Sequence, residues 1–243
     1  MGRWIVLVCV LLAGTCVAGS RSEVVVGFYP YPPFSYMDEE GRARGELLEI
    51  AAEVLERAGY SVRFKELPPA RLFQQLATGE VQVWPGVLGG PMAGLDVLES
   101  RYRLAETRLA LFYGPADPEP SLPEALSHKK VIVLRGYPYM EPARHWLQDA
   151  PLAVEQVVSN NHPSALAMLL RQRGNYMLNF LEPVNHARTS LGIGQLSMPF
   201  LPLATADLGF VVSARAGDAQ QLLDAMERQL ACHPMASLRG ETF

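Results

Sequence analysis

Short apolar runs alternate with amphipathic segments along residues 22–105. The run 24–28 is rich in β-branched residues and ends at a loop of Tyr and Pro residues, which is typical of a buried strand. Residues 46–59 have apolar side chains at helical spacing, and Gly59 is placed to end that helix. A strand over 62–66, a helix over 69–78 and a strand over 81–84 follow. This alternation predicts βαβ units and a mostly parallel sheet.

The same pattern restarts after residue 105. Strands are predicted over 109–113, 130–134, 176–180 and 207–212, and helices over 141–148, 163–173 and 218–230. A Pro-rich connector covers 114–123. Ligands of open α/β sheets bind beyond the carboxyl ends of the strands. We therefore expect a binding site formed by the loops that follow residues 28 and 66 and by the loop 85–90.

The first twenty residues are predicted to be a cleavable secretory signal and not part of the fold. Arg3 precedes an apolar run over 4–13, which is too short to span a bilayer, and small residues follow up to Ser20. Cleavage after Ala18 or after Ser20 fits this pattern, and lipidation at Cys16 is the alternative. We expect the mature protein in the periplasm.

Composition excludes several classes of function. Hydrophobic residues make up 49% of the chain and charged residues 19%, which is ordinary for a globular protein. The net charge of −4 and the absence of a basic stripe argue against a nucleic-acid partner. Only Cys232 remains after the signal, and no Cys or His cluster has metal-ligand spacing. His162 and His186 are isolated and expected at the surface or in loops, so we predict no metal and no cofactor.

Several segments together resemble the family 3 extracellular solute-binding proteins, which serve polar amino acid uptake. The first strand leads into YPPFS at 31–35, an acidic turn follows, and GEL at 45–47 opens a helix. LATGEV at 76–81 enters the next strand, KVIVLRGY at 130–137 resembles the opening of the family's second lobe, and GFVV occupies 209–212. The order and spacing of these segments carry the resemblance, which covers nearly the whole mature chain.

This resemblance implies a two-lobed α/β fold of the type II periplasmic binding protein kind. Lobe 1 is expected over 22–105 plus 204–243 and lobe 2 over 106–203, with hinges near 104–107 and 198–203. The family binds its ligand between the lobes, and the ligand drives closure by contacting both. We expect a non-catalytic monomer that captures an amino acid, an amine or an organic acid, for an inner-membrane ABC permease or for a sensor.

Two positions depart from the family pattern and bear on the ligand. Members hold an amino acid's carboxylate with an Arg just after the third strand, where this chain has Met92. They hold the ammonium group with an Asp near the end of the 176–180 strand, where Asn179 and Glu182 are the nearest residues. These departures argue against a conventional α-amino acid. A carboxylate could instead be held by Arg71, Arg101 or Arg135.

The candidate ligand-binding residues come from the loops at the expected cleft. They are Tyr31, Phe34, Arg71, Trp84, Gly86, Arg135, Tyr137, Asn179 and Glu182. Aromatic rings can stack on a ligand, glycine lets the backbone approach it, and a loop that precedes a helix favours an anionic group. Other interpretations stay open: the aromatic residues as core, Arg71 in a surface ion pair, and Glu182 in the first turn of a helix.

Two other functions fit the same sequence. Cyclohexadienyl dehydratases resemble family 3 binding proteins and use a carboxyl group in the cleft as an acid, for which Glu182 is the counterpart. An interaction module with a vestigial cleft is the third possibility. A Ser/His/Asp hydrolase is disfavoured because the chain contains no Gly-x-Ser-x-Gly motif.

Overall fold

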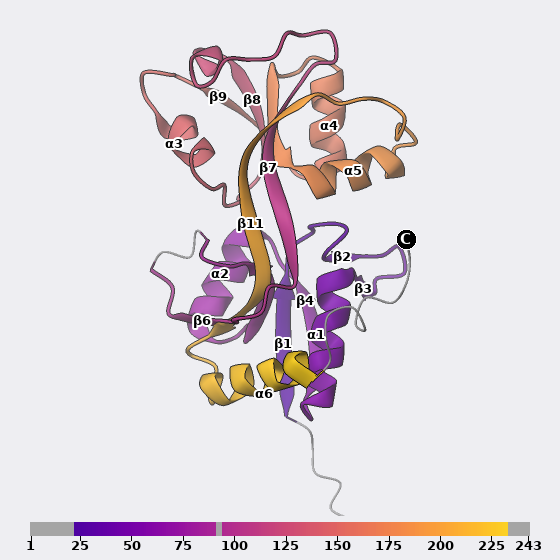
Figure 1. Ribbon diagram of the computed structural model, residues 1–243, viewed down its shortest axis with the longest axis vertical. Helices are drawn as coiled ribbons and strands as arrows, with labels where there is room; N and C mark the ends of the chain where they lie inside the picture. The colour runs from indigo at the N-terminus through magenta and orange to yellow at the C-terminus, as the bar shows by residue number, and fades with distance from the viewer. Residues whose placement is uncertain (1–21, 91–93, 233–243) are drawn as a thin grey trace, which may run out of the picture.

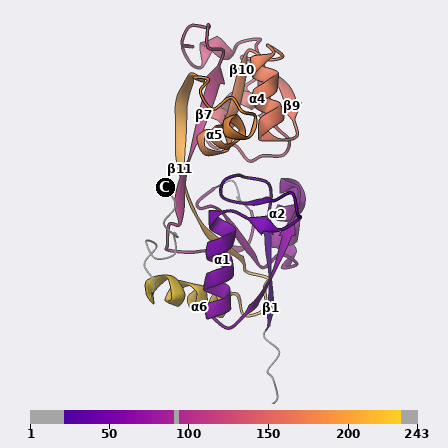
Figure 2. The same cartoon turned by 90° about the vertical axis from the view of Figure 1, so that its right-hand side faces the viewer.

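Two long antiparallel strands join two groups of secondary-structure elements. The computed structural model describes residues 22–90 and 94–232. Strands β7 (Ala105–Tyr113) and β11 (Phe200–Ser213) pair along most of their length and run from one group into the other (Figure 1). Seen from the side, this pair lies along one edge, and the two groups face one another beside it (Figure 2). We call the groups lobe 1 and lobe 2.

Lobe 1 is built on three neighbouring strands. Strand β1 (Glu23–Phe28) runs parallel to β4 (Ser61–Glu66) on one side and to β5 (Val83–Val87) on the other. The remaining elements of lobe 1 are α1 (Glu46–Arg57), α2 (Pro69–Thr78), α6 (Ala219–Cys232), β6 (Val97–Glu99) and the small ribbon of β2 (Tyr36–Met37) and β3 (Ala43–Arg44). Helix α1 buries Leu47, Ile50 and Val54, whose helical spacing puts them on one face.

Lobe 2 has a second set of parallel strands. Strand β8 (Lys130–Leu134) lies between β9 (Glu155–Ser159) and β10 (Tyr176–Phe180). Helices α4 (His162–Leu170) and α5 (Leu181–Ser190) pack on one face of these strands, and the short α3 (Ala143–Gln148) lies on the other, with a 3-10 turn at Glu124–Leu126. Strand β9 is the last strand of the sheet. On one face of β8 and β9 the covering helix is α3, which has six residues.

The strands of both lobes form one continuous sheet in the order β4-β1-β5-β11-β7-β10-β8-β9, with β6 added to β11. Pairing is parallel between β4, β1 and β5 and between β10, β8 and β9. It is antiparallel at β5–β11, β6–β11, β11–β7 and β7–β10. The predicted two-lobed α/β fold is confirmed. The predicted lobe boundaries, between 105 and 106 and between 203 and 204, fall inside the two joining strands and stay a prediction.

One predicted loop is wrong. The sequence predicts a third strand that ends at Trp84 and a cleft loop over 85–90, but β5 continues through Pro85 and Gly86 to Val87. Strand β1 contacts β5 only at Val83, so beyond that residue β11 is the one neighbouring strand. A residue without an N–H is tolerated where one side of a strand is free.

Strand β9, the short strands β2, β3 and β6, and helix α5 as an element were not predicted. The predicted signal segment and Met92 lie outside the described residues. Within 22–90 and 94–232, no helix has the length and apolar character needed to cross a membrane.

Candidate functional site

Aromatic side chains from both lobes meet between the carboxyl ends of β1, β8 and β10. Lobe 1 contributes Tyr29 and Tyr31, and lobe 2 contributes Tyr137, His162 and Phe180; we call these five rings the interlobe cluster. Ring centroids are 5.0 Å apart for Tyr29 and Tyr137, 5.2 Å for Tyr31 and Phe180, and 5.4 Å for Tyr137 and His162. Edge-to-face contacts at these distances are favourable beyond the area they bury.

Tyr137 makes the direct polar contact between the lobes. Its hydroxyl donates to the carbonyl oxygen of Pro30, and it also lies 3.0 Å from Nε2 of His162. The loop before it turns at Gly136, which has φ of 71°, a left-handed conformation that favours glycine. Tyr137 therefore reaches lobe 1 with the tip of its side chain from a tight loop.

His162 is buried, which corrects its predicted place at the surface. It follows β9 at the start of α4 and is 2% exposed. The backbone N–H of Phe180 donates to Oδ1 of Asn179, so the same oxygen accepts from Nδ1 of His162 at 2.9 Å. In neutral His162, Nε2 is then an acceptor. The hydroxyl proton of Tyr137 therefore lies near two acceptors, the carbonyl oxygen of Pro30 and Nε2 of His162. Burial lowers the pKa of His162 to about 4, because the imidazolium would lose its hydration.

A chain of hydrogen bonds links Tyr31 to lobe 2. Thr107 on β7 has one hydroxyl proton, which it donates to Oε2 of Glu182 at 2.8 Å, so the hydroxyl of Tyr31 donates to Thr107. Glu182 also accepts from the backbone N–H of Arg108 at 3.2 Å and pairs with its guanidinium at 3.3 Å. Desolvation by burial raises the pKa of Tyr31 well above its ordinary value. Among the residues that the structure describes, every hydrogen bond of Glu182 is one it accepts.

Trp84 and Gly86 form a wall of lobe 1 beneath this cluster. The Trp84 ring is 2% exposed, with centroids 5.2 Å from Phe73 and 6.0 Å from Tyr29. A Cβ added at Gly86 would lie 2.1 Å from the indole, so only glycine lets the ring lie there. The space left between Trp84 and Tyr31 is about 10 Å³, the volume of a single water-sized sphere.

The structure brings together some of the predicted site residues and separates others. Phe34 stacks on Tyr31 with centroids 5.8 Å apart, and Asn179 is fully buried beneath His162. Asn179, Glu182 and Tyr137 thus reach the interlobe region, as does Tyr31. Arg71 and Arg135 are exposed, and Arg135 lines a different and larger cavity inside lobe 2. Ligand contact stays a prediction for all nine candidates.

Sequence reasoning missed Thr107 and His162. Thr107 lies on β7, which begins four residues before the predicted strand. His162 follows the unpredicted strand β9, whose sequence EQVVS is short and half polar. With β9 recognised, the rule that sites form at the carboxyl ends of strands would have selected His162. His186, the other histidine that was expected at the surface or in a loop, is half-buried on α5, with its ring centroid 5.7 Å from that of Tyr36.

Residues 24–88 match the family of bacterial extracellular solute-binding proteins, family 3. The similarity to this family is limited to that segment, about a quarter of the chain. The match covers β1 through β5, which carry most of lobe 1. No curated protein sequence matches the chain.

Solved structures share the two-lobed fold of this chain at low sequence identity. A histidine kinase sensor domain with similarity to periplasmic binding proteins has a TM-score of 0.72 at 19% identity, over 90% of this chain and 95% of that one. An ancestral arginine-binding protein bound to arginine has a TM-score of 0.71 at 18% identity, over 90% and 97%. An ancestral amino acid-binding protein, described as a precursor of cyclohexadienyl dehydratase, has a TM-score of 0.67 at 18% identity, over 89% and 93%. These likenesses establish the fold.

Proposed function

We propose that the protein is an exported receptor that captures a small polar ligand between its lobes. The observation that supports this most is the contact between the lobes, which consists of a few side chains at the carboxyl ends of the strands. One hydroxyl group, that of Tyr137, bonds across it to Pro30. Such a contact is small enough to open and reform, and the paired strands β7 and β11 provide the link about which the lobes can move.

Side chains of the protein itself fill the space between the lobes in which a ligand would bind. A cavity of about 10 Å³ accommodates no amino acid, so binding requires the lobes or Tyr137 to move. The ligand competes with the contact between Tyr137 and Pro30. A ligand shifts such an equilibrium only by the difference between its affinities for the two states.

The chemistry around the space favours a compact polar ligand with an apolar or cationic part. Tyr29, Tyr31 and Trp84 form aromatic walls around the space. The carboxylate of Glu182 is linked to Tyr31 through the hydroxyl of Thr107. Aromatic faces and a carboxylate suit an amine or an amino acid's ammonium group. The neighbours of known structure include amino acid-binding proteins and a kinase sensor domain. Delivery to an importer and signalling to a sensor are both consistent with periplasmic capture.

A thermal-shift screen of amino acids, amines and organic acids on the purified protein tests this function. A ligand present at 100 times its dissociation constant should stabilise the fold by about 2.7 kcal/mol. Tyr31→Phe should weaken the hit about tenfold, because it removes a hydroxyl from the interlobe region. Tyr102→Phe, a half-buried tyrosine of lobe 1, is the matched control and should bind like wild type.

Two outcomes would contradict the proposal. One is a screen in which no compound raises the melting temperature. The other is a saturable hit that Tyr31→Phe and Tyr102→Phe affect equally, because that ligand would not lie between the lobes.

A dehydratase is the second candidate, since one structural neighbour is a dehydratase precursor and Glu182 lies between the lobes. The elimination needs a proton donor. Glu182 instead accepts from Thr107 and Arg108, which suits a carboxylate. Incubation with prephenate or arogenate should yield no aromatic product, and release of one would favour the enzyme.

A further inference from the structure

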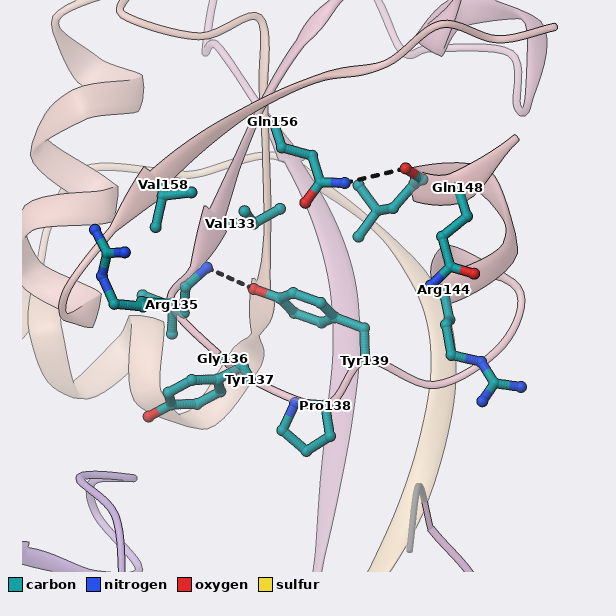
Figure 3. A pocket seen from close by; sticks show the side chains of 12 residues that line it. Val133, Arg135, Gly136, Tyr137, Pro138, Tyr139, Arg144, Gln148, Gln156 and Val158 are labelled. Atoms are coloured by element: carbon teal, nitrogen blue, oxygen red, sulfur yellow. Dashed lines mark hydrogen bonds between the residues drawn. The ribbon is translucent and has the colours of Figure 1, made fainter. Parts of the chain in front are cut away.

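A cavity near the predicted site lies within lobe 2. It has a volume of about 450 Å³ and lies between β8, β9 and α3 (Figure 3). Small-molecule sites in proteins have volumes of about 300–1,000 Å³. All of its lining residues belong to lobe 2, and Tyr137 is the one member of the interlobe cluster among them. The cavity therefore adjoins the interlobe cluster at Tyr137 and lies otherwise within lobe 2.

The cavity exists because α3 is too short to cover its side of the sheet. Side chains alternate along a strand, so Val131 and Val133 of β8 point to the α3 side, as do Gln156 and Val158 of β9. The six residues of α3 pack over Val131, whereas Val133 and Val158 line the cavity, Val133 as a buried residue and Val158 as an exposed one. Val158 is 44% exposed, which is unusual for a valine on a sheet face.

The far wall of the cavity is rigid and largely apolar. Tyr139 is buried there, and its hydroxyl accepts from the backbone N–H of Leu134 at 2.8 Å (Figure 3). The same hydroxyl donates to the carbonyl oxygen of Leu178 at 3.1 Å. Both bonds are to main-chain atoms of neighbouring strands. The ring thus stays fixed as a surface against which an aliphatic group can pack.

One cation at the rim carries an unbalanced charge. Arg144 pairs with Glu141 at 2.7 Å, so that guanidinium already has its counter-ion. Arg135 donates from Nε to the neutral amide oxygen of Asn160 at 2.9 Å, and across residues 22–90 and 94–232 it forms no ion pair. Arg135 and Val158 lie on the same side of the cavity (Figure 3). A guanidinium beside an uncovered valine is suited to a carboxylate that carries an apolar chain.

We propose that lobe 2 has a ligand site of its own, which binds a small carboxylate with a short aliphatic chain. The chain packs on Val133 and Val158, and the carboxylate bonds to Arg135. The residues assigned to this site, Arg135, Val133 and Val158, are not part of the interlobe cluster. Variants at Arg135 and Val158 therefore test this site, whereas Tyr31→Phe tests the proposed receptor function.

Hexanoate is the probe, and hexanol and hexylamine are its matched controls of neutral and positive charge. In a ¹H–¹⁵N correlation titration of the purified protein, hexanoate should saturate and shift the amide signals of Gln156 and Val158. Hexanol should bind at least tenfold more weakly, because it lacks the charge-assisted bond to Arg135. Hexylamine should produce no saturable shift.

Three variants locate the site. Arg135→Gln should weaken hexanoate about tenfold, and Val158→Trp should abolish its binding by filling the cavity. Arg171→Gln, an exposed arginine at the end of α4, should leave the affinity as in wild type.

The proposal is overturned by any of three results: no saturable shift with hexanoate up to about 10 mM, equal affinities for hexanoate and hexanol, or full binding in both Arg135→Gln and Val158→Trp. The amide spectra of the variants report their folding directly, so a lost shift in a dispersed spectrum is a binding result.

Discussion

Acidification should destabilise the protein through His162, whose ring is 2% exposed among Tyr31, Tyr137 and Asn179. The titratable groups that face it are the two tyrosines and His186. Burial lowers the pKa of His162 to about 4 in the folded protein, against 6.5 for an exposed histidine. As the pH falls below 6.5 the unfolded chain binds a proton that the native protein does not, so the unfolded state gains stability.

The magnitude follows from the pKa difference. Stability from this group is fully present above about pH 6.5 and is lost as the pH falls to about 4. Each pH unit in that window costs about 1.4 kcal/mol, so the total is about 3 kcal/mol. That is a large share of the 5–15 kcal/mol by which an ordinary domain is stable.

Urea denaturation between pH 7 and pH 4, for wild type and His162→Gln, isolates this contribution from the carboxylates that titrate in the same range. The free-energy difference between the two proteins should shrink by about 3 kcal/mol on acidification. His145→Gln, which removes an exposed histidine of α3, should retain the wild-type pH dependence. A difference between wild type and His162→Gln that stays constant with pH would refute the reasoning.

Three other substitutions test the packing that surrounds the site. Glu227→Ala should cost about 2–3 kcal/mol in urea denaturation, because the buried carboxylate accepts from the main-chain N–H of Arg101 at 2.8 Å and from its Nε at 2.7 Å. Gly86→Ala should cost about 1–3 kcal/mol and change the near-ultraviolet circular dichroism of Trp84, since the methyl group overlaps the indole; an unchanged spectrum would mean that the ring is not held there. Glu182→Gln should lower the free energy of unfolding by about 1 kcal/mol. Neither this variant nor the wild type should convert arogenate or prephenate. Turnover by the wild type that the variant abolishes would show that the protein is a dehydratase.

Much of the fold could be predicted from local pattern. The β-branched run at β1, the apolar spacing of α1 and the glycine that ends α2 each specify an element through nearby residues alone. The elements that were missed have weak local signals. Strand β9 has two polar residues at its start, and the strands β2 and β3 have two residues each.

The site was predicted less well because its residues are joined by contacts that sequence spacing does not encode. Tyr31 meets Thr107 across 76 residues, and Thr107 meets Glu182 across 75. His162 looked like a loop histidine because only the fold places it under Tyr137 and over Asn179. Trp84 was assigned to a strand end because Pro85 reads as a strand terminator.

By itself the sequence determined the class of fold and the order of its longer strands and most of its helices, because hydrophobic periodicity and turn residues act over a few positions. The tertiary structure alone decided which rings fill the space between the lobes, that His162 is buried there, and that a short α3 leaves a cavity beside Arg135. Those outcomes depend on which side chains from distant parts of the sequence pack against one another, and that packing exists only in the assembled protein.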